Sequence, residues 1–416
     1  MSEITEKGKI ARKAARGLAI ASTKIKNYAL EKMAEALDKN AKYILEANAL
    51  DMEAGEKKEL SRPLLDRLAL DGKRIKSMID GLAAVKALPD PIGEIISEWS
   101  RPNGLKIKKV RVPLGVIGII FEARPNVTVD SAALCLKSGN AVILRGGSDA
   151  LQSNLEITRH LAEAAYAAGL PEGSVQLIGD TKRETAEELM QARTYVDVLI
   201  PRGGKSLIQT VVQKSTVPVI ETGEGNCHVY VEKSADLTMA AEIVFNAKCS
   251  RPSVCNAIEK LVVDEAIAEK FLPLLKKRLD TAKVELRCDE KAHKILPDTK
   301  MAVEEDWKTE YLSYIMAVKV VSGVNEAIDH INNYSTKHSE SIITKDEKAA
   351  KIFTDQIDSA AVYVNASTRF TDGFEFGFGA EIGISTQKLH ARGPMGLSEL
   401  TSYKYIIHGT GQVREI

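Results

Sequence analysis

The chain contains 416 residues, enough for two or three domains of ordinary size, which excludes a lone small binding module. Lys and Arg total 57, as do Asp and Glu, so the net charge is zero and neither a nucleic acid nor a membrane surface is an expected partner. Hydrophobic residues make up 44% and charged residues 27%, as is typical of a folded globular protein.

Three features of the sequence bear on its location. The apolar run 112–121 is interrupted by a proline and two glycines and is far shorter than the roughly 20 residues of a transmembrane helix. The first 17 residues include Glu3 and Glu6 and have no apolar core, so no secretory signal or transit peptide is expected. The five cysteines are an odd number, which fits a reduced compartment. We therefore expect a cytoplasmic protein.

The first part of the chain predicts a helical cap, a hairpin and a parallel sheet. Apolar residues recur near every 3.6 positions in 24–50, which predicts an amphipathic helical segment that caps the main domain. The turn Pro102-Asn103-Gly104 predicts a hairpin over 99–111, outside the main sheet. From residue 110, short apolar runs alternate with helical stretches, which is typical of a parallel sheet with helices on both faces. Strands are predicted at 115–121, 141–144, 175–178, 196–200 and 217–220, and helices at 127–137, 150–168, 183–192 and 205–213.

A second alternating series follows. It predicts a second α/β unit in tandem with the first. The C-terminal residues 400–407 form a further strand candidate. The predicted elements of the second unit are strands near 260–263, 284–287, 317–321, 341–344 and 361–365, separated by helical stretches that include 265–279.

Two glycine-rich loops are candidate phosphate sites. The segments 144–148 and 201–206 each follow a predicted strand and open a helix, where free backbone N–H groups can face a phosphate. Tight turns also use glycine without a ligand, but two such loops in one sheet favour a nucleotide. The second loop is not a P-loop, because the required first glycine would fall at Leu199. The segment Gly377–Gly383 is one residue too long for the dinucleotide fingerprint.

The thiols offer a candidate nucleophile rather than a metal site. The seven histidines are dispersed, and Cys249 and Cys255 have no matching second pair, so no metal is expected. Both cysteines lie near Lys248 and Arg251, and neighbouring cations lower the pKa of a thiol and so favour the reactive thiolate. Cys135 falls in an apolar helical pattern and is expected in the core. From the residues alone, Cys255 and Cys249 both stay open as nucleophiles.

Two long segments resemble a known family. The stretch Val112–Gly147 resembles the cofactor-domain signature of the aldehyde dehydrogenase superfamily. The segment Val217–Val231, followed by Ala247-Lys248, Arg251-Pro252 and Val254-Cys255-Asn256-Ala257, resembles one branch of it, the gamma-glutamyl phosphate reductases. Matching segments continue to Gly396–Tyr405, so the resemblance covers essentially the whole chain.

The resemblance implies an aldehyde-dehydrogenase-like α/β fold of two tandem Rossmann-like domains plus a small β oligomerisation element. Residues 1–98 and 112–232 would form an NADP-binding domain, and 233–375 a catalytic α/β domain carrying Cys255. Residues 99–111 and 395–416 would form the oligomerisation hairpin and C-terminal strand.

The resemblance also implies an activity, the NADPH-dependent reduction of L-glutamyl 5-phosphate to L-glutamate 5-semialdehyde and phosphate in L-proline biosynthesis. Cys255 would be the nucleophile and carry a thioester. Asn126 is the candidate amide for the oxyanion, with a helix N-cap before Val127 as the alternative. Glu221 stands where hydrolytic relatives activate water; here it would tune the thiol or organise its loop, unless it is a solvated loop carboxylate.

The implied cofactor is NADP(H). Arg145 stands where relatives contact the adenosine ribose, and an arginine there suits a 2′-phosphate. The second glycine loop would lie at the pyrophosphate and Glu310 at the nicotinamide ribose, with a surface carboxylate as the alternative for Glu310. Arg251 or Arg369 would bind the glutamate carboxylate. The residues implied at the cofactor are Arg145, Gly146, Gly147, Ser148, Pro201, Arg202, Gly203, Gly204 and Glu310.

The implied partners are the small-molecule substrate, a second copy of the chain in a homodimer or homotetramer, and glutamate 5-kinase. Two other functions stay open. A CoA-acylating aldehyde dehydrogenase shares the thioester but passes it to a CoA thiol. A non-catalytic homologue would act as a binding scaffold, although Cys255 and the glycine loops argue against it.

Overall fold

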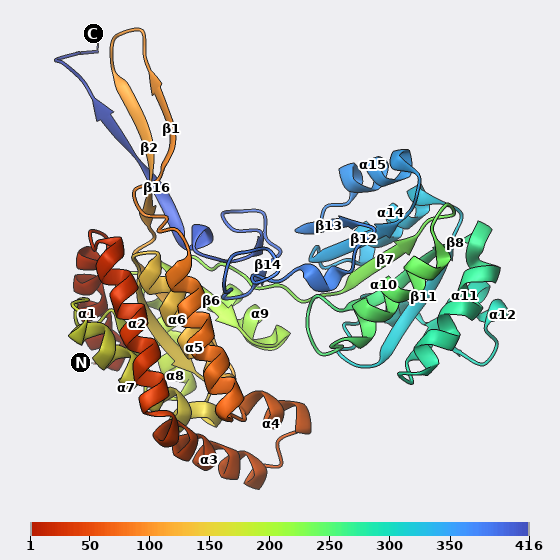
Figure 1. Ribbon diagram of the computed structural model, residues 1–416, viewed down its shortest axis with the longest axis horizontal. Helices are drawn as coiled ribbons and strands as arrows, with labels where there is room; N and C mark the ends of the chain where they lie inside the picture. Colours follow the sequence, from red (N-terminus) through yellow and green to blue (C-terminus); the bar gives the residue numbers. More distant parts are fainter. Residues whose placement is uncertain (1, 415–416) are drawn as a thin grey trace. The chain divides into compact units, whose positions relative to one another are not determined.

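The computed structural model describes residues 2–414, and the chain folds into two compact units (Figure 1). The first unit consists of the residues up to Thr222, the segment Gly377–Gly383 and the residues from Met395. The second unit consists of Gly223–Phe376 and Ile384–Pro394. Each unit has its own parallel sheet, so the prediction of two α/β units in tandem is confirmed.

The first unit is built on a four-stranded parallel sheet in the order β5-β4-β3-β6. Every residue of β3 is buried, as expected for an apolar run in a parallel sheet. The predicted strand at 217–220 is wrong, because only an isolated bridge joins Val219 to Leu199. Pro218 lacks the N–H that a regular ladder needs. The strands are β3 Val116–Phe121, β4 Ala141–Gly146, β5 Val175–Leu177 and β6 Val198–Arg202.

Helices surround this sheet, including the N-terminal helical segment that the sequence predicts. The predicted helical segment at 24–50 is confirmed, and it consists of α2 and α3, which are divided at Asn40. The Asn40 side chain donates to the Ala36 carbonyl at 2.8 Å, a local bond that competes with helix continuation. The helices of this unit are α1 Glu3–Leu18, α2 Thr23–Lys39, α3 Ala41–Lys57, α4 Arg62–Leu68, α5 Gly72–Ala87, α6 Pro125–Lys137, η1 Ser148–Ala150, α7 Leu151–Ala167, α8 Arg183–Gln191, α9 Lys205–Lys214 and η3 Ser398–Leu400.

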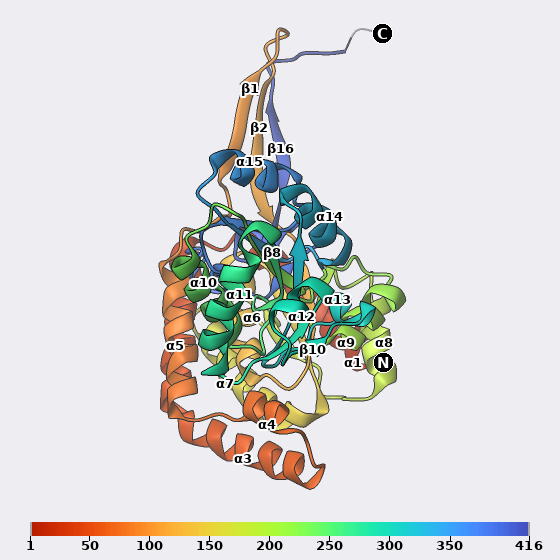
Figure 2. The ribbon, with the colours of Figure 1, turned by 90° about the vertical axis from the view of Figure 1, so that its right-hand side faces the viewer.

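The predicted hairpin and C-terminal strand form a separate antiparallel sheet. Strand β2 (Lys106–Pro113) pairs with β1 (Ile95–Ser100) on one side and with β16 (Thr401–His408) on the other. Gly104 in the turn has φ +87°, a left-handed conformation that glycine adopts without steric cost. Figures 1 and 2 both show this sheet as an arm that extends away from the rest of the first unit.

The second unit is built on a seven-stranded sheet in the order β10-β9-β11-β8-β7-β12-β13. All of its pairings are parallel. A short antiparallel pair, β14 with β15, also belongs to this unit. The strands are β7 Cys227–Val231, β8 Ile258–Asp264, β9 Glu285–Cys288, β10 Lys300–Met301, β11 Ile315–Val321, β12 Ser339–Ile343, β13 Ala361–Val364, β14 Ile384–Ser385 and β15 Gly393–Pro394.

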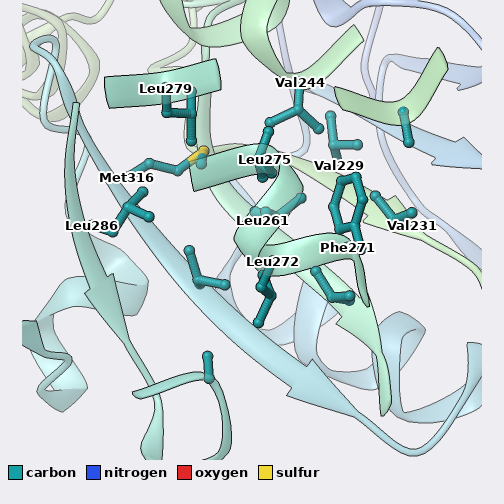
Figure 3. Packing of buried hydrophobic residues seen from close by; sticks show 14 of the residues in the cluster. Val229, Val231, Val244, Leu261, Phe271, Leu272, Leu275, Leu279, Leu286 and Met316 are labelled. Carbon is teal, nitrogen blue, oxygen red and sulfur yellow. The ribbon is translucent and has the colours of Figure 1, made fainter. Parts of the chain in front are cut away.

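Helices cover both faces of this sheet. Val229 and Val231 in β7 pack with Phe271 in the larger hydrophobic cluster (Figure 3), whereas Tyr230 between them packs with Phe353 in a second cluster. Alternate residues of one strand thus face opposite helical layers. The helices are α10 Leu237–Cys249, α11 Glu265–Asp280, α12 Glu290–Ile295, α13 Glu304–Lys308, α14 Val324–Tyr334, α15 Glu347–Gln356 and η2 Thr368–Phe370.

The boundary between the units differs from the expected domain boundary at 232. Strand β7 pairs with β8 and β12, so it belongs to the second sheet and the second unit begins at Gly223. Residues 223–232, expected in the first domain, therefore lie in the second. Within the described residues 2–414, no helix is long and apolar enough to cross a membrane.

Candidate active site

Cys255 lies in an irregular segment between α10 and β8, where its side chain is half-buried. Gly225 packs directly against its backbone, because a Cβ atom at position 225 would lie 1.4 Å from the Cys255 carbonyl oxygen. The Cys227 thiol donates to the same oxygen at 3.1 Å. The backbone of the candidate nucleophile is therefore fixed by tight contacts from the segment that leads into β7.

Cys249 has a less reactive environment. It ends α10, and burial raises the pKa of its thiol to about 11, although Lys248 and Arg278 lower it. A thiol with a raised pKa is mostly protonated at neutral pH and is a weak nucleophile. Cys135 is fully buried in α6, as predicted, and burial raises the pKa of its thiol. The raised pKa counts against Cys249 as the nucleophile, and Cys255 stays the residue that the resemblance implies.

Two arginines accompany Cys255. The Arg369 Nε donates to Ser250 Oγ at 3.0 Å, and its Nη1 donates to Asn256 Oδ1. Burial and then the Arg251 charge lower the pKa of Arg369, whereas negative charge on Asp372 and Cys255 raises it. The structure thus brings the predicted residues Arg251 and Arg369 into the neighbourhood of the thiol.

Asn256 was missed by the sequence analysis. The Asn256 side-chain Nδ2 donates to the Thr371 carbonyl at 2.8 Å. The backbone carbonyl of Asn256 accepts from the Thr368 hydroxyl at 2.6 Å. These bonds tie the residue after Cys255 to the segment that carries Arg369. In the sequence, the only sign of this role is that an amide residue directly follows the candidate nucleophile Cys255.

Glu310 also reaches this site. It lies between α13 and β11, and its Oε1 accepts the Gly225 N–H at 2.8 Å. Since Gly225 also touches Cys255, one glycine connects the candidate nucleophile with the candidate cofactor carboxylate. Glu310 is half-buried, so its role at the cofactor and the alternative of a surface carboxylate both stay predictions.

In the first unit, Arg145 lies in β4 and its charge is partly buried. Its Nη2 donates to the carbonyls of Thr181 at 2.8 Å and Lys182 at 3.3 Å. Burial lowers the pKa of Arg145, and the Asp180 charge raises it. The Nε is buried without a hydrogen-bond partner among the described residues, so this guanidinium has unused capacity for an anion.

The two glycine loops differ in what their glycines do. A Cβ at Gly146 would lie 2.3 Å from Asn154 Nδ2, so this glycine is required by packing within the unit. Gly147 has only ordinary contacts at 3.7 Å and beyond, so its backbone is open to a close approach. Ser148 follows it and begins the short helix η1.

The second loop holds an internal carboxylate that the sequence analysis missed. The Gly204 N–H, at the N-terminus of α9, donates to Glu122 Oε2 at 2.9 Å. A Cβ at Gly203 would lie 2.7 Å from the Glu122 carboxyl carbon. A pyrophosphate bound at this amide would therefore replace the Glu122 carboxylate. The signal in the sequence was an acidic residue directly after the buried strand 116–121.

Asn126 and Glu221 belong to the first unit, whereas Cys255 belongs to the second. The N-cap alternative for Asn126 is wrong, because α6 begins at Pro125 and its N-cap is Arg124. The exposed Asn126 amide donates to Asp130 Oδ2 at 3.1 Å. Burial raises the pKa of Asp130 to about 6, against the effects of Asn126 and Arg202. Glu221 is half-buried in an irregular segment.

Metal ligands are not grouped in the described part of the chain. Among residues 2–414, no three His, Cys, Asp or Glu side chains form a group that could hold a metal ion. The charged groups near Cys255 include Arg251 and Arg369, and guanidinium groups bind anionic substrate groups well.

Comparisons with known proteins agree with this geometry. Residues 2–295 match the model of the aldehyde dehydrogenase family. A gamma-glutamyl phosphate reductase of Moorella thermoacetica is 60% identical over 413 residues, covering 99% of each chain. One of Clostridium beijerinckii is 60% identical over 414 residues, covering 100% of each chain.

Solved structures give the same result. The crystal structure of gamma-glutamyl phosphate reductase from Thermotoga maritima has a TM-score of 0.97 and 53% identity, covering 100% of both chains. An acetylating aldehyde dehydrogenase from Geobacillus thermoglucosidasius has a TM-score of 0.70 at 18% identity, covering 100% of this chain and 98% of that one, a likeness of fold alone. The family resemblance is thereby confirmed, and the chain belongs to the aldehyde dehydrogenase family, within its gamma-glutamyl phosphate reductase branch.

Proposed function

We propose that this protein reduces L-glutamyl 5-phosphate to L-glutamate 5-semialdehyde and phosphate, a step of L-proline biosynthesis. Relatives at 60% identity over the whole chain carry the name gamma-glutamyl phosphate reductase, which supports this substrate. The observation that carries the proposal is the position of Arg369, which donates to Ser250 and Asn256, the sequence neighbours of Arg251 and Cys255. The substrate has an acyl phosphate and an α-carboxylate, and two adjacent guanidinium groups match two anionic groups.

The first half of the reaction is an acyl transfer to Cys255. The thiolate sulfur attacks the acyl carbon and forms a tetrahedral intermediate. When that intermediate collapses, the bond between the acyl carbon and the phosphate oxygen breaks, and inorganic phosphate leaves with the electron pair. A nearby arginine stabilises the charge on the departing phosphate. The acyl group is then held as a thioester on Cys255, positioned by the Gly225 contact.

The second half is reduction of this thioester. When bound, a reduced nicotinamide would supply the hydride, and Cys255 would hold the thioester carbon that accepts it. The tetrahedral oxyanion formed on Cys255 then collapses: the aldehyde carbonyl re-forms as the carbon–sulfur bond breaks, and the thiolate is released for another turnover with no net proton taken up in this half. Asn126, as a donor to the oxyanion, and Glu221, as a residue that tunes the thiol, stay predictions from the sequence.

We propose NADP(H) as the cofactor. The buried Nε of Arg145 without a partner, and the open backbone at Gly147, fit an added phosphate group at the end of β4. The adenosine ribose and its 2′-phosphate would be held by Arg145, Gly146, Gly147 and Ser148. The second loop, Pro201 to Gly204, would hold the pyrophosphate in place of Glu122, and Glu310 would bind the nicotinamide ribose.

We expect Arg145→Ala to weaken NADPH binding about 10- to 100-fold and NADH binding far less. The substitution removes a charge-assisted contact that only the 2′-phosphate makes, worth roughly 1.5–3 kcal/mol. Fluorescence titration of both cofactors measures the difference. Arg159→Ala serves as the control, because Arg159 is exposed on α7 and pairs with Glu156. Equal weakening of both cofactors would exclude this role for Arg145.

The reverse reaction tests the proposed function. With glutamate semialdehyde and NADP as substrates, we expect NADPH formation to require inorganic phosphate, because the thioester must be released to the group that left in the forward direction. Arsenate should replace phosphate, and CoA should not. The rate of NADPH formation, measured by absorbance with each acceptor in turn, provides the readout.

The other outcomes identify the alternatives. Steady turnover in phosphate-free buffer, with free glutamate as the product, would indicate hydrolysis of the thioester and a water-activating role for Glu221. A strict requirement for CoA would move the protein to the acylating branch. Absence of cofactor binding would indicate the scaffold function.

We also propose a homodimer or homotetramer that assembles through the β1-β2-β16 sheet. Trp99, Tyr403, Tyr405 and Ile407 are exposed on this sheet, and exposed aromatic residues on an edge strand favour a protein partner. The five free cysteines support a reducing compartment such as the cytoplasm. The lability of the acyl phosphate favours association with glutamate 5-kinase, which would supply it.

A further inference from the structure

Three charged side chains are completely buried beside the site in the second unit. Glu259 and Lys260 are neighbours in β8, and Lys248 lies near the end of α10; all three are 0% exposed. The Lys248 Nζ lies 2.6 Å from Glu259 Oε2. Burying a charge costs several kcal/mol unless it is well paired. Three buried charges therefore need partners, or a function, that offset this cost.

Lys260 Nζ also donates to the Glu259 carbonyl at 3.4 Å, and two further bonds of this pair lead to one short segment. The Lys260 Nζ donates to the Thr309 carbonyl at 2.7 Å. The Leu312 N–H donates to Glu259 Oε1 at 3.1 Å. Thr309 and Leu312 stand on either side of Glu310 in the sequence, so the two bonds fix the backbone before and after that carboxylate.

The backbone held by these bonds has an unfavourable conformation. Leu312 has φ +52°, in the left-handed region that residues with a Cβ rarely adopt. Such a conformation persists only where the surroundings hold it. The Lys260 ammonium also lies 4.5 Å from the centre of the Tyr311 ring, a further contact to the same segment.

Strand β8 connects this segment to the nucleophile. It begins at Ile258, shortly after Cys255, so the residues that hold the Glu310 segment share a short stretch of chain with the thiol. Gly225 completes the connection, because its N–H donates to Glu310 and its Cα packs on Cys255. A displacement of β8 would therefore move both groups.

We propose that Glu259 and Lys260 are positioning residues, which hold Glu310 at the place and orientation from which it binds the nicotinamide ribose. The proposal rests on the cofactor role given to Glu310 under the proposed function. It assigns a purpose to charges that would otherwise only destabilise β8. Burial lowers the pKa of Lys260 to about 7, against the effect of Glu259, so its charge is costly where it stands.

A double-mutant cycle tests whether Lys260 acts through Glu310. Lys260→Met, Glu310→Gln and the double variant are compared by NADPH fluorescence titration and by kcat/KM for the cofactor. We expect Lys260→Met to lose roughly tenfold in both, as for one charge-assisted hydrogen bond. The double variant should be no worse than Glu310→Gln alone. Additive losses would overturn the proposal, because they would show a structural role independent of Glu310.

Further variants separate positioning from general stability. Lys260→Arg should restore most of the loss, and alkylation of Cys255 by iodoacetamide should stay unchanged in Lys260→Met. Lys137→Met is the matched control, because Lys137 is also buried and donates to a carbonyl, that of Lys86, at 2.9 Å. It should lower the melting temperature without changing the affinity for NADPH. A comparable loss of affinity in the control would contradict the proposal.

Two further results have to be distinguished: a Lys260 variant that does not fold, and a wild-type protein that does not bind the cofactor. If Lys260→Met does not fold, Glu259→Gln enters the same cycle, because it removes the charge that orders Leu312 while keeping a side chain of the same size. Failure of the wild-type protein to bind a reduced nicotinamide cofactor would overturn the proposed function and this proposal together. Additivity in a protein that binds the cofactor would overturn this proposal alone.

Discussion

Replacing Cys255 by serine should abolish turnover while the protein stays folded. A serine hydroxyl is a far weaker nucleophile than a thiolate at neutral pH unless a dedicated base activates it, so we expect a loss of at least about 1,000-fold in kcat, equivalent to roughly 4 kcal/mol of barrier. The reduction of glutamyl phosphate, or the oxidation of glutamate semialdehyde with phosphate, measures this loss. The melting temperature should change little, because the thiol is only half-buried.

Cys249→Ser provides the control for this experiment. Its thiol has a raised pKa and lies at the end of α10, so the variant should keep its activity. Retention of more than about a tenth of the wild-type rate in Cys255→Ser, a loss under roughly 1.4 kcal/mol, would exclude Cys255 as the nucleophile. Inactivity of Cys249→Ser with Cys255→Ser active would reverse the two assignments.

Among the glycine-to-alanine substitutions in the second unit, we expect Gly225→Ala to be the most damaging. The added Cβ would lie 1.4 Å from the Cys255 carbonyl oxygen and 2.6 Å from its Cα, and backbone atoms cannot swing aside as a flexible side chain can. We expect the free energy of unfolding to fall by about 3 kcal/mol or more, since overpacking at a rigid site reaches or exceeds that range.

The same change should cost about 100-fold or more in kcat, because the displaced segment carries the nucleophile and also donates to Glu310, and a shift of roughly 1 Å at a reacting group has that effect. Gly72→Ala is the matched control, since no atom outside its own helix lies within 4 Å of its Cβ position. Thermal unfolding and steady-state kinetics of the two variants compare the effects. Normal activity of Gly225→Ala would show that Cys255 tolerates displacement and is not the reacting group.

The regular elements were largely predictable because burial leaves a clear pattern. The run that forms β3 is apolar on both faces, and those that form β8 and β11 are mostly apolar, so the parallel sheets followed from these short runs and the helical stretches between them. Predictions failed where one residue changes the hydrogen bonding. Pro218 reduced the apolar run at 217–220 to an isolated bridge, so no strand forms there.

The candidate site was less predictable, because its connecting residues act through backbone contacts. Cys255 carries its chemistry in its residue type, and family resemblance identified it. Nothing in the letters around Gly225 indicates that it touches Cys255, since the contact joins segments distant in the sequence. Glu259 and Lys260 left a detectable signal, two charges inside an otherwise apolar strand, which is unusual unless the charges have buried partners.

The pairing of β16 with β2 imposes an order on folding during synthesis. Thr401 lies opposite Pro113, and His408 opposite Lys106, so one edge of β2 stays open until the end of the chain has left the ribosome. At about 5–20 residues per second, that wait is on the order of tens of seconds. Most of the second unit is one continuous stretch, Gly223–Phe376, that emerges in the meantime. An open strand edge is where nascent chains aggregate or recruit chaperones, so newly made protein should be most vulnerable there, and C-terminal truncation before Thr401 should make that vulnerability permanent.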